Sequence, residues 1–166
     1  MAPPPERDYT KYREPVREDF GECCAYCLLF EVLAGGRDNF ELDHFRPKSR
    51  PEFSHLATDF FNIYYSCHVC NHYKGSRWPS TELLAAGCRY VNTCRDEFAE
   101  HFTALDDGTW RPVSKPGEYS EAMLRLNRTH LKDLRGMLNQ IADKKKKPRI
   151  DWSVATRRAI LDLLQS

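Results

Sequence analysis

The sequence of 166 residues has no long hydrophobic run and no excess of one charge. Its most apolar stretches, residues 27–30 and 32–34, are far too short to cross a bilayer, which needs about 20 apolar residues. The formal net charge is +1, so any surface for nucleic acid must be a local patch. Residues 1–5 lack the charged and apolar regions of a signal peptide. We therefore expect a cytoplasmic protein with no membrane partner.

The composition is that of a folded chain, because 41% of the residues are hydrophobic and 12% are aromatic. The length suits one domain with at most a small appendage. We find no internal repeat, and the lysine run at residues 144–147 is the only low-complexity stretch.

Seven cysteines are present, and four of them form two C-x-x-C pairs, Cys24/Cys27 and Cys67/Cys70. Each pair fits the tight turn that brings two thiolates onto one zinc ion, and four thiolates make a closed, structural site. The alternatives are disulfides or free buried cysteines. Because cytoplasmic thiols stay reduced, the spacing favours a structural Zn²⁺ site.

The other three cysteines do not form such pairs. Cys23 offers a poorer register than Cys24 for a pair with Cys27. Cys88 and Cys94 lie without a second pair, so we interpret them as core thiols and not as a second metal site.

Residues 40–78 predict two strands and a helix. Residues 40–45 alternate, with Phe40 and Leu42 on one face and the acidic side chains on the other, and a proline at 47 ends the strand. A loop over 46–59 precedes a second strand at 60–66. A helix is expected from 68 to about 77, with Gly75 in its last turn.

The flanking regions are predicted more coarsely. Residues 1–20 indicate a lead-in that is flexible or hugs the surface. Residues 21–78 are predicted to form the core, and residues 79–166 a mostly helical extension packed on the core. The extension is expected to begin with a short helix at 80–86, followed by loops and short strands over 88–117. Ser120 is expected to cap the next helix, and the helix after it has Leu131 to Ile141 on one face and stops at 144–148. A last helix is expected from Asp151 or Ser153.

Asp43, His44 and Asn71 carry the candidate chemistry. The carboxylate of Asp43 and the amide oxygen of Asn71 are ligands that a hard cation such as Mg²⁺ prefers. A neutral His44 can take a proton from water near neutral pH. A lone histidine is more often structural, but the Asp-His pair between two cysteine knuckles favours a functional histidine.

Together, C-x-x-C, L-D-H-x-x-P, an asparagine and C-x-x-C-N-x-x-K-G resemble the HNH family of metal-dependent endonucleases. The resemblance covers residues 21–78 and implies a ββα-metal core, within an overall α+β fold. It implies that His44 is the general base and that Asp43 and Asn71 hold a catalytic Mg²⁺ or Mn²⁺, with His72 as a fallback ligand. It makes Asn62 a brace for the loop that carries His44.

Basic side chains near this core are candidate contacts for nucleic-acid phosphates. They are Arg46, Lys48 and Arg50 after the Asp-His pair, and His72, Lys74 and Arg77 on the following helix. Residues 125–158 also carry an excess of positive charge around the lysine run, which suits either a solvated helix end or phosphate binding.

The sequence thus predicts an HNH endonuclease that hydrolyses DNA phosphodiester bonds, with double-stranded DNA as partner. It also resembles bacterial stand-alone HNH proteins. One alternative is a non-catalytic zinc-knuckle module that binds nucleic acid or protein. Another is a nuclease subunit that a protein partner activates in a defence system. No pattern predicts the oligomeric state.

Overall fold

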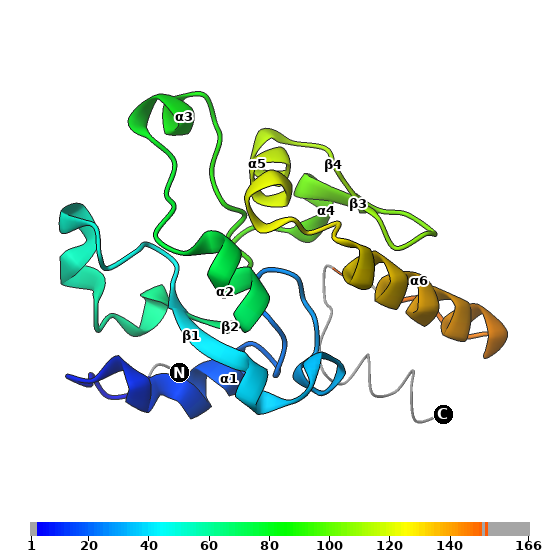
Figure 1. Cartoon of the computed structure of the whole chain (residues 1–166), viewed down its shortest axis with the longest axis horizontal. Coiled ribbons are helices and arrows are strands. Elements are labelled where there is room, and N and C mark those ends of the chain that lie inside the picture. The colour runs from blue at the N-terminus through cyan, green and yellow to red at the C-terminus, as the bar shows by residue number, and fades with distance from the viewer. Residues whose placement is uncertain (1–2, 151, 153–166) are drawn as a thin grey trace. The chain divides into compact units, whose positions relative to one another are not determined.

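A computed structural model describes residues 3–150 and Trp152 (Figure 1). The helix predicted from Asp151 or Ser153 lies outside the described residues. The chain divides into two compact units: the first comprises residues 1–25 and 29–78, and the second residues 26–28 and 79–166. Among the described residues, none of the helices has both the length and the apolar character needed to cross a membrane.

The first unit is built on an antiparallel hairpin of β1 (Phe40–His44) and β2 (Ile63–Cys67). Phe40 pairs with Cys67 and His44 pairs with Ile63, so the end of β1 lies beside the start of β2. The helix α2 (His68–Lys74) follows β2 directly and packs on both strands (Figure 1). This arrangement confirms the predicted ββα core.

Short 3₁₀ segments occupy several places where the sequence predicts loop or strand. They are η1 (Tyr9–Tyr12), η2 (Glu31–Ala34), η3 (Arg37–Asn39), η4 (Pro51–Leu56) and η5 (Phe60–Asn62). The second strand therefore begins three residues later than predicted. The reason is local, because the Asp59 carboxylate accepts a hydrogen bond from the Phe61 amide and fixes η5 as a turn.

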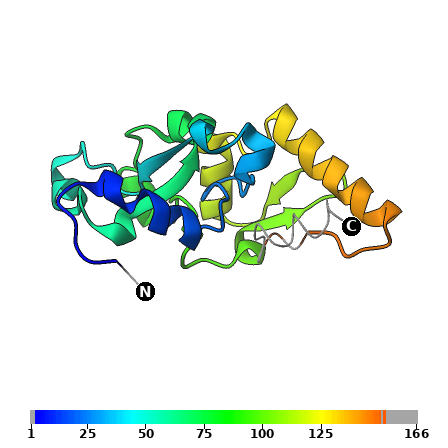
Figure 2. The same cartoon turned by 90° about the horizontal axis from the view of Figure 1, so that it is seen from below.

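The lead-in, expected to be flexible or to hug the surface, contains a helix, α1 (Arg13–Asp19), which packs against β2 (Figure 2). Tyr12 and Val16 are buried. The Tyr12 ring lies edge-on to Phe60, with ring centroids 5.2 Å apart. These contacts are with residues distant in sequence, so the polar, proline-containing segment gave no periodic signal of them.

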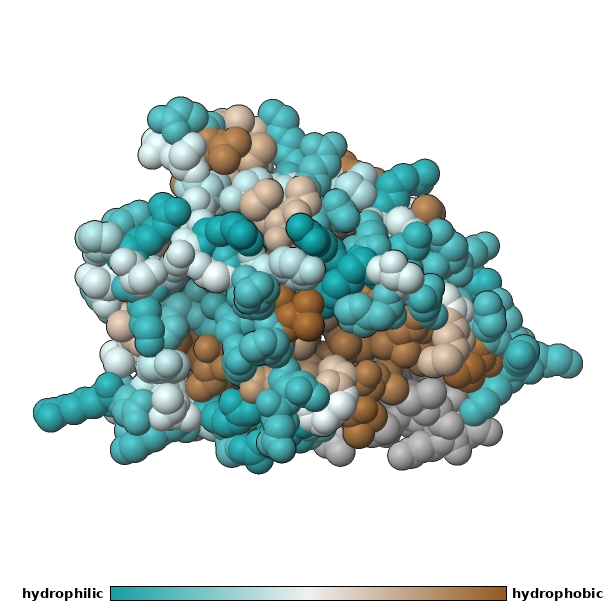
Figure 3. Space-filling view, in the orientation of Figure 1, coloured by the Kyte–Doolittle hydropathy of each residue, from teal (hydrophilic) through white to brown (hydrophobic). Residues whose placement is uncertain are grey.

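The second unit combines helices with a small hairpin. Its elements are α3 (Thr81–Ala85), α4 (Phe98–His101), β3 (Phe102–Ala104), β4 (Trp110–Pro112), α5 (Lys115–Leu124) and α6 (Thr129–Lys144). The strands pair antiparallel, with Phe102 opposite Pro112. Ser80 caps α3 by accepting a hydrogen bond from the Leu83 amide. Leu83 and its neighbour Leu84 are exposed, and hydrophobic side chains appear at the surface in this region (Figure 3).

The start of α5 corrects one prediction. Ser114, and not Ser120, caps this helix: its hydroxyl accepts a hydrogen bond from the Gly117 amide. Ser120 lies inside the helix and is buried, where its hydroxyl accepts a hydrogen bond from the Val91 amide. Pro116 fits the first turn of a helix, whose amides need no partner within the helix.

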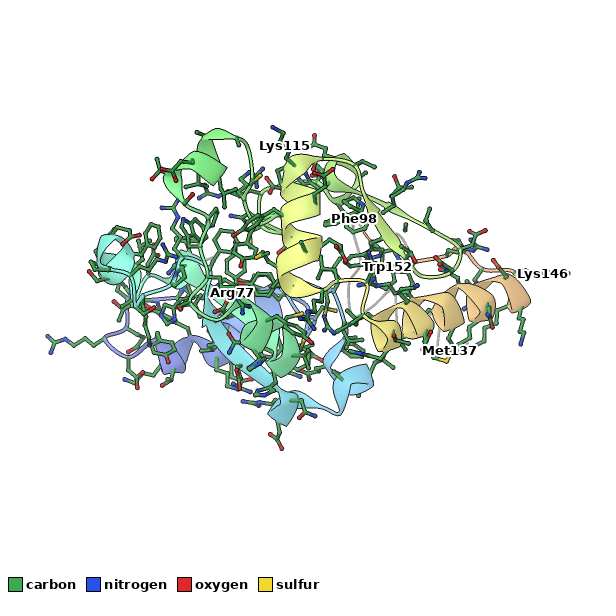
Figure 4. The ribbon with its side chains drawn as sticks, turned by 45° about the horizontal axis from the view of Figure 1, so that its top comes forward. Arg77, Phe98, Lys115, Met137, Lys146 and Trp152 are labelled. Carbon is green, nitrogen blue, oxygen red and sulfur yellow. The ribbon has the colours of Figure 1, made fainter. Side chains whose placement is uncertain are left out.

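The core of the second unit centres on Trp110, which is 1% exposed. Its ring contacts Phe98 and Trp152, which lie close together in Figure 4. The guanidinium carbon of Arg135, from α6, lies 3.4 Å from the centroid of the Trp110 ring. The helix α6 buries Leu131 and Leu138 as predicted and presents the exposed Met137 on its outer face (Figure 4).

Candidate active site

Four cysteines meet at one point. The sulfur atoms of Cys24, Cys27, Cys67 and Cys70 all lie within 4.8 Å of one another, and the four residues are buried. None of the seven cysteines is in a disulfide. Four convergent thiolates are the donor set of structural zinc, so the residues fit the predicted ion. Two connections hold the first knuckle in place: the Cys24 amide donates to the Leu29 carbonyl, and the Ala25 amide donates to the Tyr65 carbonyl.

The remaining cysteines are placed by the structure. Cys23 is buried outside the four-sulfur cluster, where it forms a β-bridge with Phe30. Cys24 is therefore the residue in register. The interpretation of Cys88 and Cys94 as core thiols is wrong for Cys94, which is exposed, while Cys88 is half-buried.

Asp43 lies against a buried lysine. The Lys74 ammonium is 2.9 Å from one Asp43 carboxylate oxygen and 3.2 Å from the other, and it donates to the His44 carbonyl at 2.7 Å. The Lys74 residue is 0% exposed. Burial lowers the pKa of Lys74, and the Asp43 carboxylate opposes that shift. The prediction that Lys74 contacts nucleic-acid phosphates is therefore wrong, because its ammonium has no access to the surface.

Asn71 lies beside a second acidic residue of β1. The Asn71 amide nitrogen donates to one oxygen of Glu41, and the His68 ring nitrogen Nδ1 lies 2.8 Å from the other. Burial raises the pKa of Glu41, but the hydrogen bonds from His68 and Asn71 outweigh it and lower the pKa. A carboxylate can only accept, so the Asn71 nitrogen faces Glu41 and its oxygen faces elsewhere.

Glu41 was not predicted as a site residue, although the alternation of the strand offered the signal. Glu41 and Asp43 share one face of β1 because side chains two residues apart point the same way. Two side chains of the helix α2 contact these two carboxylates. Asn71 contacts Glu41, and Lys74, three residues later and on the same side of the helix, contacts Asp43.

The imidazole of His44 is held by a hydrogen bond to a main-chain carbonyl. Its Nε2 atom is 2.9 Å from the Ala57 carbonyl oxygen. Because a carbonyl only accepts, Nε2 carries the proton in the neutral ring and Nδ1 is the atom that can accept one. The residue is 7% exposed, and burial lowers the pKa of His44, although the bond to Ala57 opposes the shift. The imidazole is therefore neutral near pH 7.

Asn62 joins the two ends of the loop after β1. Its side-chain oxygen accepts from the Arg46 amide at 2.9 Å, and its nitrogen donates to the Arg46 carbonyl at 3.0 Å and to the Leu56 carbonyl at 3.3 Å. The residue is 4% exposed. Arg46 lies two residues after His44, and Leu56 directly precedes Ala57. The bonds of Asn62 therefore fix the backbone near His44 and near the carbonyl that His44 contacts.

Of the predicted phosphate contacts, four are at the surface: Arg46, Lys48, His72 and Arg77. Arg50 is half-buried, and its guanidinium donates to the carbonyls of Ser76 and Trp78. Figure 4 shows Arg77 beyond the end of α2. The first unit thus has exposed basic side chains both in the loop after β1 and along and just after α2, the two segments next to the Asp43–Lys74 pair.

Comparison with known protein families gives one match to this region. Residues 24–77 match the family model described as HNH endonuclease. These residues make up less than half of the chain, yet they include the whole cysteine cluster and the segment from β1 to α2. The curated proteins include no match to the chain.

Proposed function

From the premise that residues 24–77 form an HNH endonuclease domain, we propose that the chain hydrolyses phosphodiester bonds of DNA, with His44 as the general base. The observation that carries the proposal is the bond from His44 to Ala57. The bond fixes Nε2 as the nitrogen that carries a proton, so Nδ1 of the neutral imidazole is the atom that can take a proton from water.

The proton transfer needs a fixed ring. His44 Nδ1 takes a proton from the attacking water, and the ring becomes an imidazolium whose Nε2–H still donates a hydrogen bond to the Ala57 carbonyl. Asn62 acts as a positioning residue in this step because it ties Arg46, two residues after His44, to the loop that carries Ala57. Lys74 holds the backbone at His44 itself, because its ammonium donates to the His44 carbonyl.

Asp43 and Asn71 would hold the catalytic Mg²⁺ or Mn²⁺. Both offer oxygen, which hard divalent cations prefer. The Asn71 oxygen is turned away from Glu41, and the Asp43 side chain offers carboxylate oxygens. The donor set therefore fits the ion. When bound, such an ion stabilises charge on the phosphate oxygens and the leaving oxygen.

The remaining groups support and aim this centre. The four-cysteine zinc site would tie the knuckle at Cys24 to the start of α2, and α2 carries Asn71. The exposed Arg46, Lys48, His72 and Arg77 would contact phosphates of double-stranded DNA beside the scissile bond. Such contacts release counterions, so binding should weaken steeply as the salt concentration rises.

Cleavage of supercoiled plasmid with Mg²⁺ or Mn²⁺ tests the proposal. We expect His44→Ala to lower the cleavage rate by about 100-fold or more, because a positioned base contributes at least that much. His130→Ala, in α6 of the second unit, is the matched control and should cleave as wild type. Equal rates for wild type and His44→Ala would refute the role of His44, and an inactive wild type with either ion would refute the endonuclease assignment.

A further inference from the structure

We propose that Tyr9, in a segment that precedes the family match, is a positioning residue for His44, and that residues 8–13 form a wall of the candidate active site. This inference rests on the proposed function, because it assigns Tyr9 a part in placing the base.

The segment is anchored firmly on its C-terminal side. Tyr12 is 2% exposed, and its hydroxyl accepts a hydrogen bond from the Glu6 amide at 2.6 Å. The Arg13 guanidinium donates to the Phe40 carbonyl at 2.8 Å and to the Arg37 carbonyl at 3.1 Å. Phe40 is the first residue of β1, so Arg13 attaches the segment directly to the strand that ends at His44.

The turn that carries Tyr9 is fixed from the other side by Asp8. One carboxylate oxygen of Asp8 accepts from both the amide and the hydroxyl of Thr10, at 3.0 and 2.8 Å. This is the capping arrangement that begins η1. With Asp8 holding one end and Tyr12 the other, the backbone at Tyr9 has a defined position.

The Tyr9 ring lies between two groups of the site. Its centroid is 4.7 Å from that of the His44 imidazole, with the rings at 68°, an edge-to-face contact. The Lys48 ammonium lies 4.0 Å from the centroid of the same Tyr9 ring. One hydrogen bond to Ala57 fixes a single atom of the imidazole, and the Tyr9 contact restricts tilting of its plane.

The same segment lines a hollow beside the candidate metal ligand. The hollow has a volume of about 370 Å³. Its lining residues are Tyr9, Thr10 and Arg13 from the segment, with Glu41, Leu42 and Asn71 from β1 and α2. The segment therefore touches the site at two places, the imidazole through Tyr9 and the neighbourhood of Asn71 through this hollow.

Substitution of Tyr9 tests the inference when kinetics and spectroscopy are measured on the same variants. Tyr9→Leu should lower kcat by about 10-fold with little change in KM, because a misplaced base slows the chemical step more than binding. Tyr9→Phe keeps the ring and should restore kcat to within about two-fold of wild type. The matched control is Tyr119→Leu, which removes a similar edge-on contact with Tyr90 at 5.1 Å, in the second unit.

The spectroscopic measurement separates this inference from the proposed function. In proton–carbon NMR spectra at fixed pH, Tyr9→Leu should move the His44 ring signals, because the ring current of the tyrosine is lost, and Tyr119→Leu should not. If those signals do not move, or if an active protein keeps its kcat in Tyr9→Leu, the inference is wrong. If they move while the wild type cleaves nothing, the contact stands, but the positioning role falls with the nuclease assignment.

Discussion

Replacement of Lys74 by methionine removes an ammonium and keeps a side chain of similar length. The Lys74 residue is 0% exposed, and its ammonium bonds to both Asp43 oxygens and to the His44 carbonyl. The change would leave the Asp43 carboxylate, itself 6% exposed, without its cation and the His44 carbonyl without its donor. Removing one partner of a buried ion pair costs about 3–5 kcal/mol. We expect a loss of that size in the free energy of unfolding of Lys74→Met.

The double variant Asp43→Asn with Lys74→Met measures how much of the loss comes from the stranded charge. Because removing both charges is often close to neutral, we expect the double variant to recover at least about 1 kcal/mol relative to Lys74→Met. Such non-additivity is typical of groups in direct contact.

The assay is urea denaturation of zinc-loaded protein, followed by circular dichroism. Lys144→Met, which changes an exposed lysine at the end of α6, is the control and should lie within about 0.5 kcal/mol of wild type. A loss below about 1 kcal/mol for Lys74→Met, or a double variant no more stable than the single one, would refute the reasoning.

Two further predictions concern the metal and the pH. The purified protein should contain about one zinc ion per chain. Because structural zinc supplies folding free energy, Cys67→Ser or a strong chelator should abolish cooperative unfolding of the first unit. Zinc-free protein that melts as wild type would contradict this prediction. Burial raises the pKa of Glu31, but hydrogen bonds from Arg17 and Tyr65 outweigh it and lower the pKa below 4.5. The stability that Glu31 contributes is therefore present above its unfolded pKa and is lost as the pH falls through the lower, folded pKa. Wild type should lose more stability than Glu31→Gln between pH 7 and about pH 3, as measured by urea denaturation; parallel losses would show that this carboxylate is not the cause.

Much of the first unit could be predicted because its signals are local. Alternating side chains gave β1, and the C-x-x-C spacing gave four cysteines that do converge. The helix after Cys67 follows from its position and from Gly75, which has a φ of +48° and ends α2.

The parts that sequence reasoning missed depend on contacts between distant residues. Lysine is usually exposed and is almost never fully buried without a partner. The sequence near Lys74 did not indicate that its side chain turns inward to Asp43. Tyr9 meets His44 only because Tyr12 and Arg13 attach its segment to the hairpin. These side chains carry no spacing pattern, and their roles follow only from the folded structure.

The bond between His44 and Ala57 has a consequence for mutational surveys of this chain. The acceptor is a main-chain oxygen, which every amino acid at position 57 would also present. A scan that exchanges one side chain at a time would therefore classify position 57 as tolerant and overlook its contribution. Inserting or deleting one residue between Pro47 and Ala57 would shift that oxygen along the chain. Length variants of this loop should be far more damaging than its point substitutions.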